Sequence, residues 1–193
     1  MPPVPDKQLE ERILKAAQRL WHTRGESGFT VREIARAAGT TTPTLYQRFR
    51  NKEALLFALA LRVRDALDGE LFACSSPEEA CRRYLRYAES NPEEYELIRM
   101  LWPRTAADLP RPARAWLLSQ LAARFGGYSE EYAKLYYAFV FLCHGAASML
   151  TATERGSPVR EEIRENCIRV CEKMIENVGI FRTSPSSRER SGS

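Results

Sequence analysis

The sequence lacks the features of a membrane or secreted protein. Its most apolar run, Leu135–Leu150, has sixteen residues and contains a histidine, whereas a membrane-spanning helix needs roughly 18 apolar residues. The five cysteines are scattered, with no signal peptide ahead of them. An odd, scattered set favours free thiols in a reducing compartment over a disulfide framework. We therefore predict a cytoplasmic protein without membrane contact.

Catalytic and metal-binding motifs are absent as well. Neither of the two histidines, His22 and His144, follows a glutamate by three residues, as a di-iron helix bundle requires. No nucleophile elbow, phosphate-binding glycine loop or zinc-protease motif occurs. Cys167 and Cys171 lie four residues apart, which suits a thiol sensor or a metal, but without a nearby histidine or second cysteine pair buried structural thiols are favoured. We predict no enzymatic activity, no cofactor and no metal site.

No segment shows the alternation of a β-strand, and the capping signals predict about nine helices. Helices are expected to begin at Ser76-Pro77, Asn91-Pro92 and Ser157-Pro158, because each pair joins a capping residue to a proline at the first helical position. The predicted fold class is therefore all-α.

Several helix limits can be predicted from single residues. The first helix is expected from a cap at Asp6 to about Arg24, the eighth from Ser129 to Arg155, and the ninth up to Gly179. The residues that follow are rich in serine and arginine, and residues 183–193 are expected to form a disordered tail.

Residues 28–53 predict a helix-turn-helix. Thr30, followed by a glutamate three residues later, forms a capping box for one short helix, and Gly39 ends that helix. Thr42 is the expected N-cap of a second short helix, with Pro43 at its first position. Two short helices joined by a glycine-containing turn are typical of DNA-binding domains, in which the second helix lies in the major groove.

Positive charge is concentrated in the same part of the chain. Residues 1–52 hold ten Lys/Arg and five Asp/Glu, a net charge of +5, whereas the remainder holds nineteen and twenty, a net charge of −1. This excess suits contacts with phosphates, although a small basic excess is also compatible with an ordinary solvated face.

An ordered set of residues in the first quarter of the chain carries a family resemblance. The matching positions are Ile13, Ala16–Ala17, Gly28–Ala35, Ala38-Gly39, Leu45–Phe49 and Asn51–Leu56. Together they resemble the N-terminal domain of the tetracycline-repressor-like (TetR) family of bacterial transcriptional regulators. The resemblance implies a three-helix helix-turn-helix DNA-binding domain in residues 1–52 and a ligand-binding and dimerisation bundle in residues 53–182. It implies a ligand-responsive repressor that binds a pseudo-palindromic operator as a homodimer and is released by a small apolar or aromatic molecule.

The resemblance also assigns DNA contacts residue by residue. The positions that match phosphate contacts are Thr30, Tyr46 and Lys52. The positions that match the groove-facing surface are Thr41, Thr42, Pro43, Thr44 and Gln47. Glutamine bonds adenine through two contacts and threonine methyls pack on thymine methyls. Arg48 is either a phosphate contact or a solvated helix end.

The C-terminal part is rich in aromatic residues at helical spacing. In such a family these residues would line an apolar effector pocket: Tyr84, Tyr87, Trp102, Trp116, Tyr136 and Phe139, with His144. The competing interpretation is ordinary core packing for the aromatic residues and a hydrogen-bonded core histidine for His144.

The eighth and ninth helices carry more apolar surface than one small bundle needs. A second copy of the chain would cover this surface in a symmetric four-helix interface, and a purely intramolecular core is the alternative. A dimer would place its two recognition helices on two successive half-sites of a DNA operator. A helical adaptor that binds only protein remains a competing class, but it leaves the basic N-terminal region unexplained.

Overall fold

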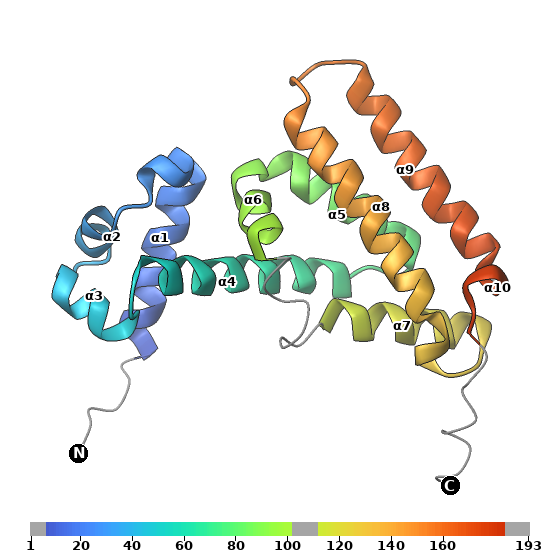
Figure 1. Cartoon of the computed structure of the whole chain (residues 1–193), viewed down its shortest axis with the longest axis horizontal. Coiled ribbons are helices and arrows are strands. Elements are labelled where there is room, and N and C mark those ends of the chain that lie inside the picture. Colours follow the sequence, from blue (N-terminus) through green and yellow to red (C-terminus); the bar gives the residue numbers. More distant parts are fainter. Residues whose placement is uncertain (1–6, 102–111, 184–193) are drawn as a thin grey trace, which may run out of the picture. The chain divides into compact units, whose positions relative to one another are not determined.

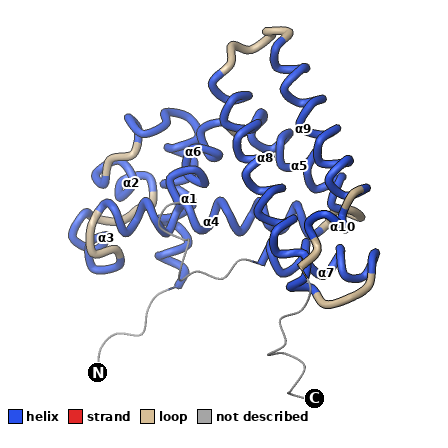
Figure 2. The backbone as a smooth tube through the Cα atoms, turned by 45° about the vertical axis from the view of Figure 1, so that its right-hand side comes forward, coloured by secondary structure: helices blue, strands red, loops and turns tan. Residues whose placement is uncertain are grey.

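A computed structural model describes residues 7–101 and 112–183 of the chain. Every regular element within these ranges is a helix, and no strand is present in them (Figure 2). The all-α prediction is therefore confirmed. Of the expected disordered tail, residues 184–193 lie outside the described ranges.

The described ranges contain ten α-helices and one 3₁₀ turn (Figure 1). In chain order they are α1 (Lys7–Gly28), α2 (Val31–Ala37), α3 (Thr42–Arg48), α4 (Lys52–Phe72), α5 (Pro77–Ser90), α6 (Pro92–Leu101), α7 (Pro112–Phe125), η1 (Ser129–Tyr132), α8 (Ala133–Ala152), α9 (Val159–Glu176) and α10 (Val178–Phe181). The count exceeds the nine predicted because a short tenth helix follows α9. The expected starts after Ser76 and Asn91 are confirmed.

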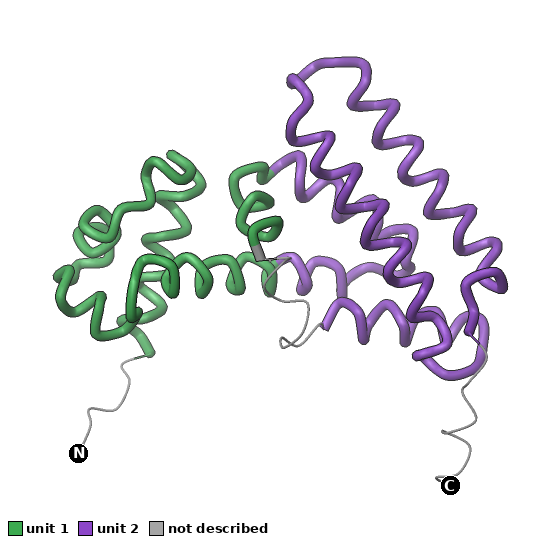
Figure 3. The backbone as a smooth tube through the Cα atoms, viewed as in Figure 1, with its two compact units in different colours: residues 1–66, 91–108 green, residues 67–90, 109–193 purple. Residues whose placement is uncertain are grey.

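One compact unit comprises residues 1–66 and 91–108 (Figure 3). Its helices pack α1 against both α2 and α6, and α2 against α3. Trp21 of α1 lies at the centre, 1% exposed. Its Nε1 donates to the Glu93 carbonyl of α6 over 2.5 Å, and its ring meets that of Phe29 edge-on at 5.4 Å. Burial of large apolar side chains is the main stabilising contribution here.

Polar contacts also tie α6 to this unit. Gln18 Nε2 donates to Glu94 Oε1 of α6 over 3.0 Å, and Gln18 Oε1 accepts from Arg62 Nε, also over 3.0 Å. Arg62 reaches Glu11 Oε2 at 2.7 Å as well. The helix-turn-helix core therefore includes a helix that lies more than 40 residues further along the chain.

The first regular helix ends near Arg24, as predicted. The span of α1 to Gly28 joins two helical pieces across a kink at Gly25, whose φ of 58° and ψ of −147° are non-helical. Only glycine adopts this backbone region without strain. The glycine therefore interrupts the regular helix, and a short helical piece follows it up to Gly28.

The second unit comprises residues 67–90 and 109–193 (Figure 3). Within it, α8 packs against both α5 and α9. A partly buried ionic cluster joins α5 to α9: Glu89 of α5 accepts hydrogen bonds from Arg160 and Arg164 of α9. Arg160 also donates to the carbonyls of Leu150 and Thr153 at the end of α8.

The limits predicted for the last two long helices need correction. Ser129 begins a 3₁₀ turn that precedes α8, and α8 ends at Ala152, three residues before Arg155. Thr153 is extended, because Arg160 takes up the last carbonyls of the helix. The ninth helix ends at Glu176 and not at Gly179, since the side chain of Asn177 donates to a carbonyl of the last turn over 2.9 Å.

The segment Ser129–Ala152 is long and apolar enough to cross a membrane by length and composition alone. The segment is longer than the sixteen-residue apolar run in the sequence, because it also takes in η1 and both ends of α8. Its packing against α5 and α9 is the arrangement of a core helix, so this helix is no convincing membrane span.

Candidate nucleic-acid interface

The first helix of the helix-turn-helix is capped as predicted. Thr30 Oγ1 accepts from the backbone N–H of Glu33 over 3.3 Å, which satisfies one of the free donors of the first turn. At the other end Gly39 has φ of 66°, and the N–H of Thr40 donates to the carbonyl of Ala35 over 2.9 Å. This left-handed glycine closes the helix and starts the turn.

The second helix is capped one residue earlier than predicted. Thr41 has extended backbone angles, and its Oγ1 accepts from the N–H of Thr44 over 3.3 Å. Thr42 is therefore the first helical residue and Pro43 the second. The hydroxyls of Thr41 and Thr44 also bond each other over 2.9 Å. Two adjacent threonines could each have capped the helix, and in the structure it is the Thr41 hydroxyl that accepts the N–H of the first turn.

The inner and outer faces of α3 agree with the sequence pattern. Leu45 is fully buried and Phe49, just after the helix, is 7% exposed. Tyr46 is 46% exposed, and Gln47 next to it is also exposed. Of the remaining expected contact residues, Thr30, Thr41, Pro43 and Lys52 are exposed, whereas Thr42, Thr44 and Arg48 are half-buried. The expected site residues of α3 thus lie on a short helix that two buried side chains fix in place.

The start of α4 adds a cationic position. Asn51 Oδ1 accepts from the N–H of Ala54 over 2.7 Å, so Asn51 caps the start of α4. Lys52 is the first residue of α4, and its Nζ lies 5.7 Å from the centre of the Phe29 ring, within the range of a cation–π contact. The lysine charge and the positive end of the α4 helix dipole both attract an anion at this point.

Further exposed basic residues belong to the same segment but were not assigned a role from the sequence. Arg32 and Arg36 are exposed on α2, and Arg50 is exposed between α3 and α4. The acidic Glu33 is engaged by Arg24 at 3.1 Å and by Arg36 at 3.9 Å. The net charge of +5 in residues 1–52 indicates that basic residues of this segment contact DNA, but it does not show which of the arginines do so.

The residues expected to line an effector pocket are only partly brought together by the contacts described. Tyr84 of α5 and His144 of α8 meet, with the hydroxyl 3.1 Å from Nδ1. Trp116 lies beside Phe72, at a ring separation of 6.2 Å. Tyr87, Tyr136 and Phe139 are buried, and Trp102 lies outside the described residues. Their assignment to a ligand site stays a prediction.

The cysteines give a result that the sequence did not indicate. Cys81 of α5 and Cys143 of α8 lie beside Cys167 and Cys171 of α9, with all four sulfurs within 4.8 Å of one another. We call these residues the four-cysteine cluster. The sequence contains no second cysteine pair close to Cys167 and Cys171 along the chain, but the fold brings Cys81 and Cys143 next to them. The expectation that no other cysteines lie nearby is therefore wrong.

Comparisons with known proteins agree with this geometry. Residues 13–59 match the family model described as bacterial regulatory proteins, tetR family. The class D tetracycline repressor protein of Escherichia coli is 42% identical over 53 residues, which cover 28% of this chain and 24% of that protein. An HTH-type transcriptional repressor of Mycobacterium tuberculosis is 29% identical over 117 residues, 59% of this chain and 57% of that protein. The chain thus spans about a quarter of the length of the first of these relatives.

Solved structures extend the likeness in fold to nearly the whole chain. A TetR transcriptional regulator from Streptomyces coelicolor superposes with a TM-score of 0.66 at 22% identity, covering 94% of this chain and all of that one. A TetR variant from Acinetobacter baumannii, solved in complex with minocycline, gives 0.64 at 19% identity and covers 89% and 97%. At these identities the likeness concerns the fold alone. The proteins of this group are transcription regulators and not enzymes. Residues 13–59, which contain the helix-turn-helix, thus match the tetR family of bacterial regulatory proteins, and the chain as a whole shares the fold of TetR regulators.

Proposed function

We propose that this protein is a DNA-binding transcriptional repressor that binds a pseudo-palindromic operator as a homodimer in the cytoplasm. The observation that carries the proposal is the outer face of α3, where Tyr46 and Gln47 are exposed while Leu45 and Phe49 fix the helix from within. A short, capped helix with a polar outer face has the form of a recognition helix for the major groove.

Each exposed residue of this face has a physical role in the proposal. Gln47 pairs with an adenine edge, and the threonine methyls of α3 pack on thymine methyls. Tyr46, Thr30 and Lys52 contact phosphates, which orient the domain without reading sequence. Arg48 is half-buried and supplies charge near the backbone.

The dimer is supported by apolar side chains on the outer face of α8. Tyr137, Phe141 and Met149 are 39%, 65% and 57% exposed, and their spacing of four and eight residues places them on one stripe of the helix. Val170 on α9 is 45% exposed. Exposed apolar side chains in a continuous row mark a surface that another chain covers, and a second copy of α8 and α9 would form a four-helix interface.

Regulation by a small molecule completes the proposal. Residues 53–182 would form the effector and dimerisation part and residues 1–52 the DNA-binding part. The buried aromatic residues Tyr87, Tyr136 and Phe139 support an apolar or aromatic effector, and the similar fold of a tetracycline-family regulator that binds minocycline supports the same class. Effector binding lowers operator affinity, so by linkage operator binding lowers effector affinity by the same factor.

Selection of bound duplexes from a random DNA pool tests the proposal with the full chain. The selected sequences should contain two related half-sites separated by about one helical turn or a multiple of it. Failure to bind any duplex at low salt contradicts the proposal and favours a protein-binding adaptor.

Two variants then separate the assigned roles on the selected operator. Lys52→Ala should weaken binding to all duplexes about equally and reduce the salt slope by about one, whereas Gln47→Ala should relax preference at one base position. Arg86→Ala, at an exposed arginine on α5, makes the same change in charge outside both the DNA-binding surface and the proposed dimer interface and should leave the salt slope unchanged. Uniform loss across all sequences for Gln47→Ala contradicts its role.

A further inference from the structure

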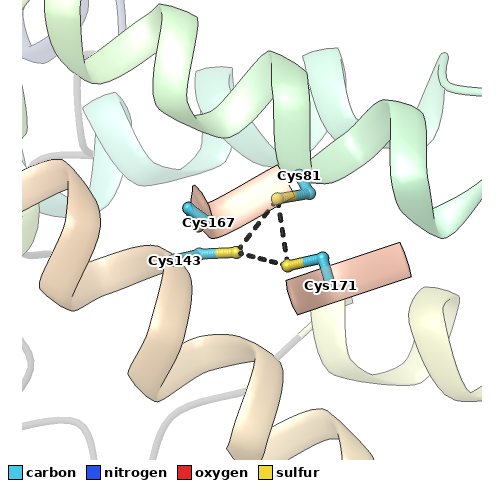
Figure 4. A group of neighbouring side chains, drawn as sticks. All are labelled: Cys81, Cys143, Cys167 and Cys171. Atoms are coloured by element: carbon cyan, nitrogen blue, oxygen red, sulfur yellow. Dashed lines mark hydrogen bonds between the residues drawn. The ribbon is translucent and has the colours of Figure 1, made fainter. Parts of the chain in front are cut away.

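The four-cysteine cluster lies in the interior of the second unit, at the meeting point of three helices (Figure 4). Its residues are between 0% and 8% exposed. Two of them, Cys167 and Cys171, lie four residues apart on the buried face of α9, where side chains at this spacing are neighbours. The other two enter from α5 and α8.

The distances between the sulfurs are those of a small coordination shell. Cys81 and Cys171 are 3.1 Å apart, Cys81 and Cys143 are 3.5 Å apart, and Cys143 and Cys171 are 3.8 Å apart. A zinc–sulfur bond of about 2.3 Å places the corners of a tetrahedron about 3.8 Å from one another. The cluster, whose sulfurs are all within 4.8 Å, therefore needs only small adjustments to surround one ion.

The surrounding contacts hold the ligand helices in this arrangement. Arg82, next to Cys81, pairs with Glu172, next to Cys171, so the two backbones that carry these sulfurs are linked beside the cluster. The ionic cluster at Glu89 joins the same two helices further along. Preorganised donors bind metal more tightly because little of the chain must be ordered on binding.

Buried thiols alone do not account well for this grouping. All four thiols converge on one place in the core, with their sulfurs within 4.8 Å of one another. A single buried cysteine fills core space as a small apolar residue does, but chance packing does not require four of them, from three helices, to meet at one point.

We propose that the four-cysteine cluster binds one thiophilic d¹⁰ cation, Zn²⁺ or Cu⁺, through its sulfur atoms. Soft thiolates select these ions over magnesium, calcium and manganese, and four sulfurs form a closed site of the structural type. Each coordinating thiol loses its proton to solvent as the metal–sulfur bond forms, and no electron is transferred. Metal binding would lock α5, α8 and α9 together, because the ligands come from all three. The site is independent of whether the chain binds DNA.

Metal titration of the full-length chain tests the site. The reduced, metal-free protein, kept in a phosphine reductant, is titrated with Co²⁺ as a spectroscopic probe, then with Zn²⁺, and separately with Cu⁺ against a coloured Cu⁺ chelator. We expect one ion per chain, the sulfur-to-cobalt charge-transfer and strong visible bands of a tetrahedral thiolate site, and displacement of cobalt by the preferred ion. The competition distinguishes Zn²⁺ from Cu⁺.

Cysteine variants locate the site. Cys143→Ser and Cys171→Ser should each weaken metal binding by at least about tenfold. Loss of a residue that only supports a metal ligand already costs about 10–100-fold in affinity, so loss of a ligand itself should cost no less. Cys74→Ser is the matched control, because Cys74 is also buried but its Sγ donates to the carbonyl of Glu70 outside the cluster. This variant should bind one ion with unchanged affinity.

Thermal unfolding keeps the test decisive where a cluster variant does not fold. The wild-type chain and Cys74→Ser should both unfold at a higher temperature with bound metal than without it, since only the folded state assembles the site. The proposal is overturned if the reduced chain takes up less than one ion, or if cobalt gives only weak octahedral bands. The proposal is also overturned if folded Cys143→Ser binds the metal as tightly as the wild type. It is overturned equally if the metal-free chain contains a disulfide within the four-cysteine cluster.

Discussion

Loss of the Glu89 carboxylate should destabilise the C-terminal unit far more than loss of a surface carboxylate. Glu89 lies on α5 and is 15% exposed at its side chain. Its oxygens accept from Arg160 Nη2 at 3.0 Å, and from Arg164 Nε and Nη2 at 3.1 and 2.8 Å. Arg160 in turn holds the end of α8 through two backbone carbonyls. One carboxylate therefore connects three helices.

The magnitude follows from these contacts and their burial. Breaking a buried ion pair by removing one partner costs about 3–5 kcal/mol, because the remaining charge is left unpaired. The arginine side chains are 14% and 31% exposed, so solvent screens part of this cost. We expect Glu89→Ala to lower the free energy of unfolding by about 2–4 kcal/mol.

Urea unfolding at neutral pH, followed by far-ultraviolet circular dichroism, measures the effect. Glu176→Ala is the matched control: its carboxylate pairs with Lys173 at 2.6 Å, but both side chains are more than half exposed. Its loss should cost less than about 1 kcal/mol. Equal destabilisation by the two variants would refute the reasoning that burial decides the difference.

The pH dependence provides an independent check. The hydrogen bond from Arg164, followed by the charges of both arginines, lowers the pKa of Glu89. A carboxylate with a depressed pKa in the folded state stabilises the protein above its unfolded pKa of about 4.3 and loses that contribution as the pH falls through the folded value. The stability difference between wild type and Glu89→Gln should therefore be constant near neutrality and shrink below about pH 4.

Two further predictions concern the core of the DNA-binding unit and the dimer. Trp21→Phe removes the hydrogen bond to the Glu93 carbonyl and part of a fully buried ring, so unfolding should cost about 1–3 kcal/mol less; an unchanged urea midpoint by circular dichroism would contradict this. Phe141→Glu should convert the proposed dimer to a monomer in sedimentation equilibrium without loss of helix content. The control Tyr128→Glu, at an aromatic residue 74% exposed outside α8 and α9, should leave the dimer intact, and persistence of a dimer in Phe141→Glu argues against this interface.

Local structure was largely predictable because it depends on residues close together in the chain. The caps at Thr30, Ser76 and Asn51 each involve a backbone N–H three residues away, and the inner face of α3 follows from helical spacing. Where two neighbours competed, as at Thr41 and Thr42, the sequence left an ambiguity of one residue. The dimer, effector and DNA contacts remain predictions, because they involve molecules outside the chain.

The sequence by itself determined the all-helical fold, the helix-turn-helix and the concentration of basic charge around it. Only the tertiary structure decided that α6 packs with α1, through the bond between Trp21 and Glu93, 72 residues apart. It likewise brought together Cys81 and Cys171, which are 90 residues apart. The physical reason is that helix signals are local, whereas the partner of a buried side chain depends on how whole helices pack, and one chain's residue spacing does not specify that packing.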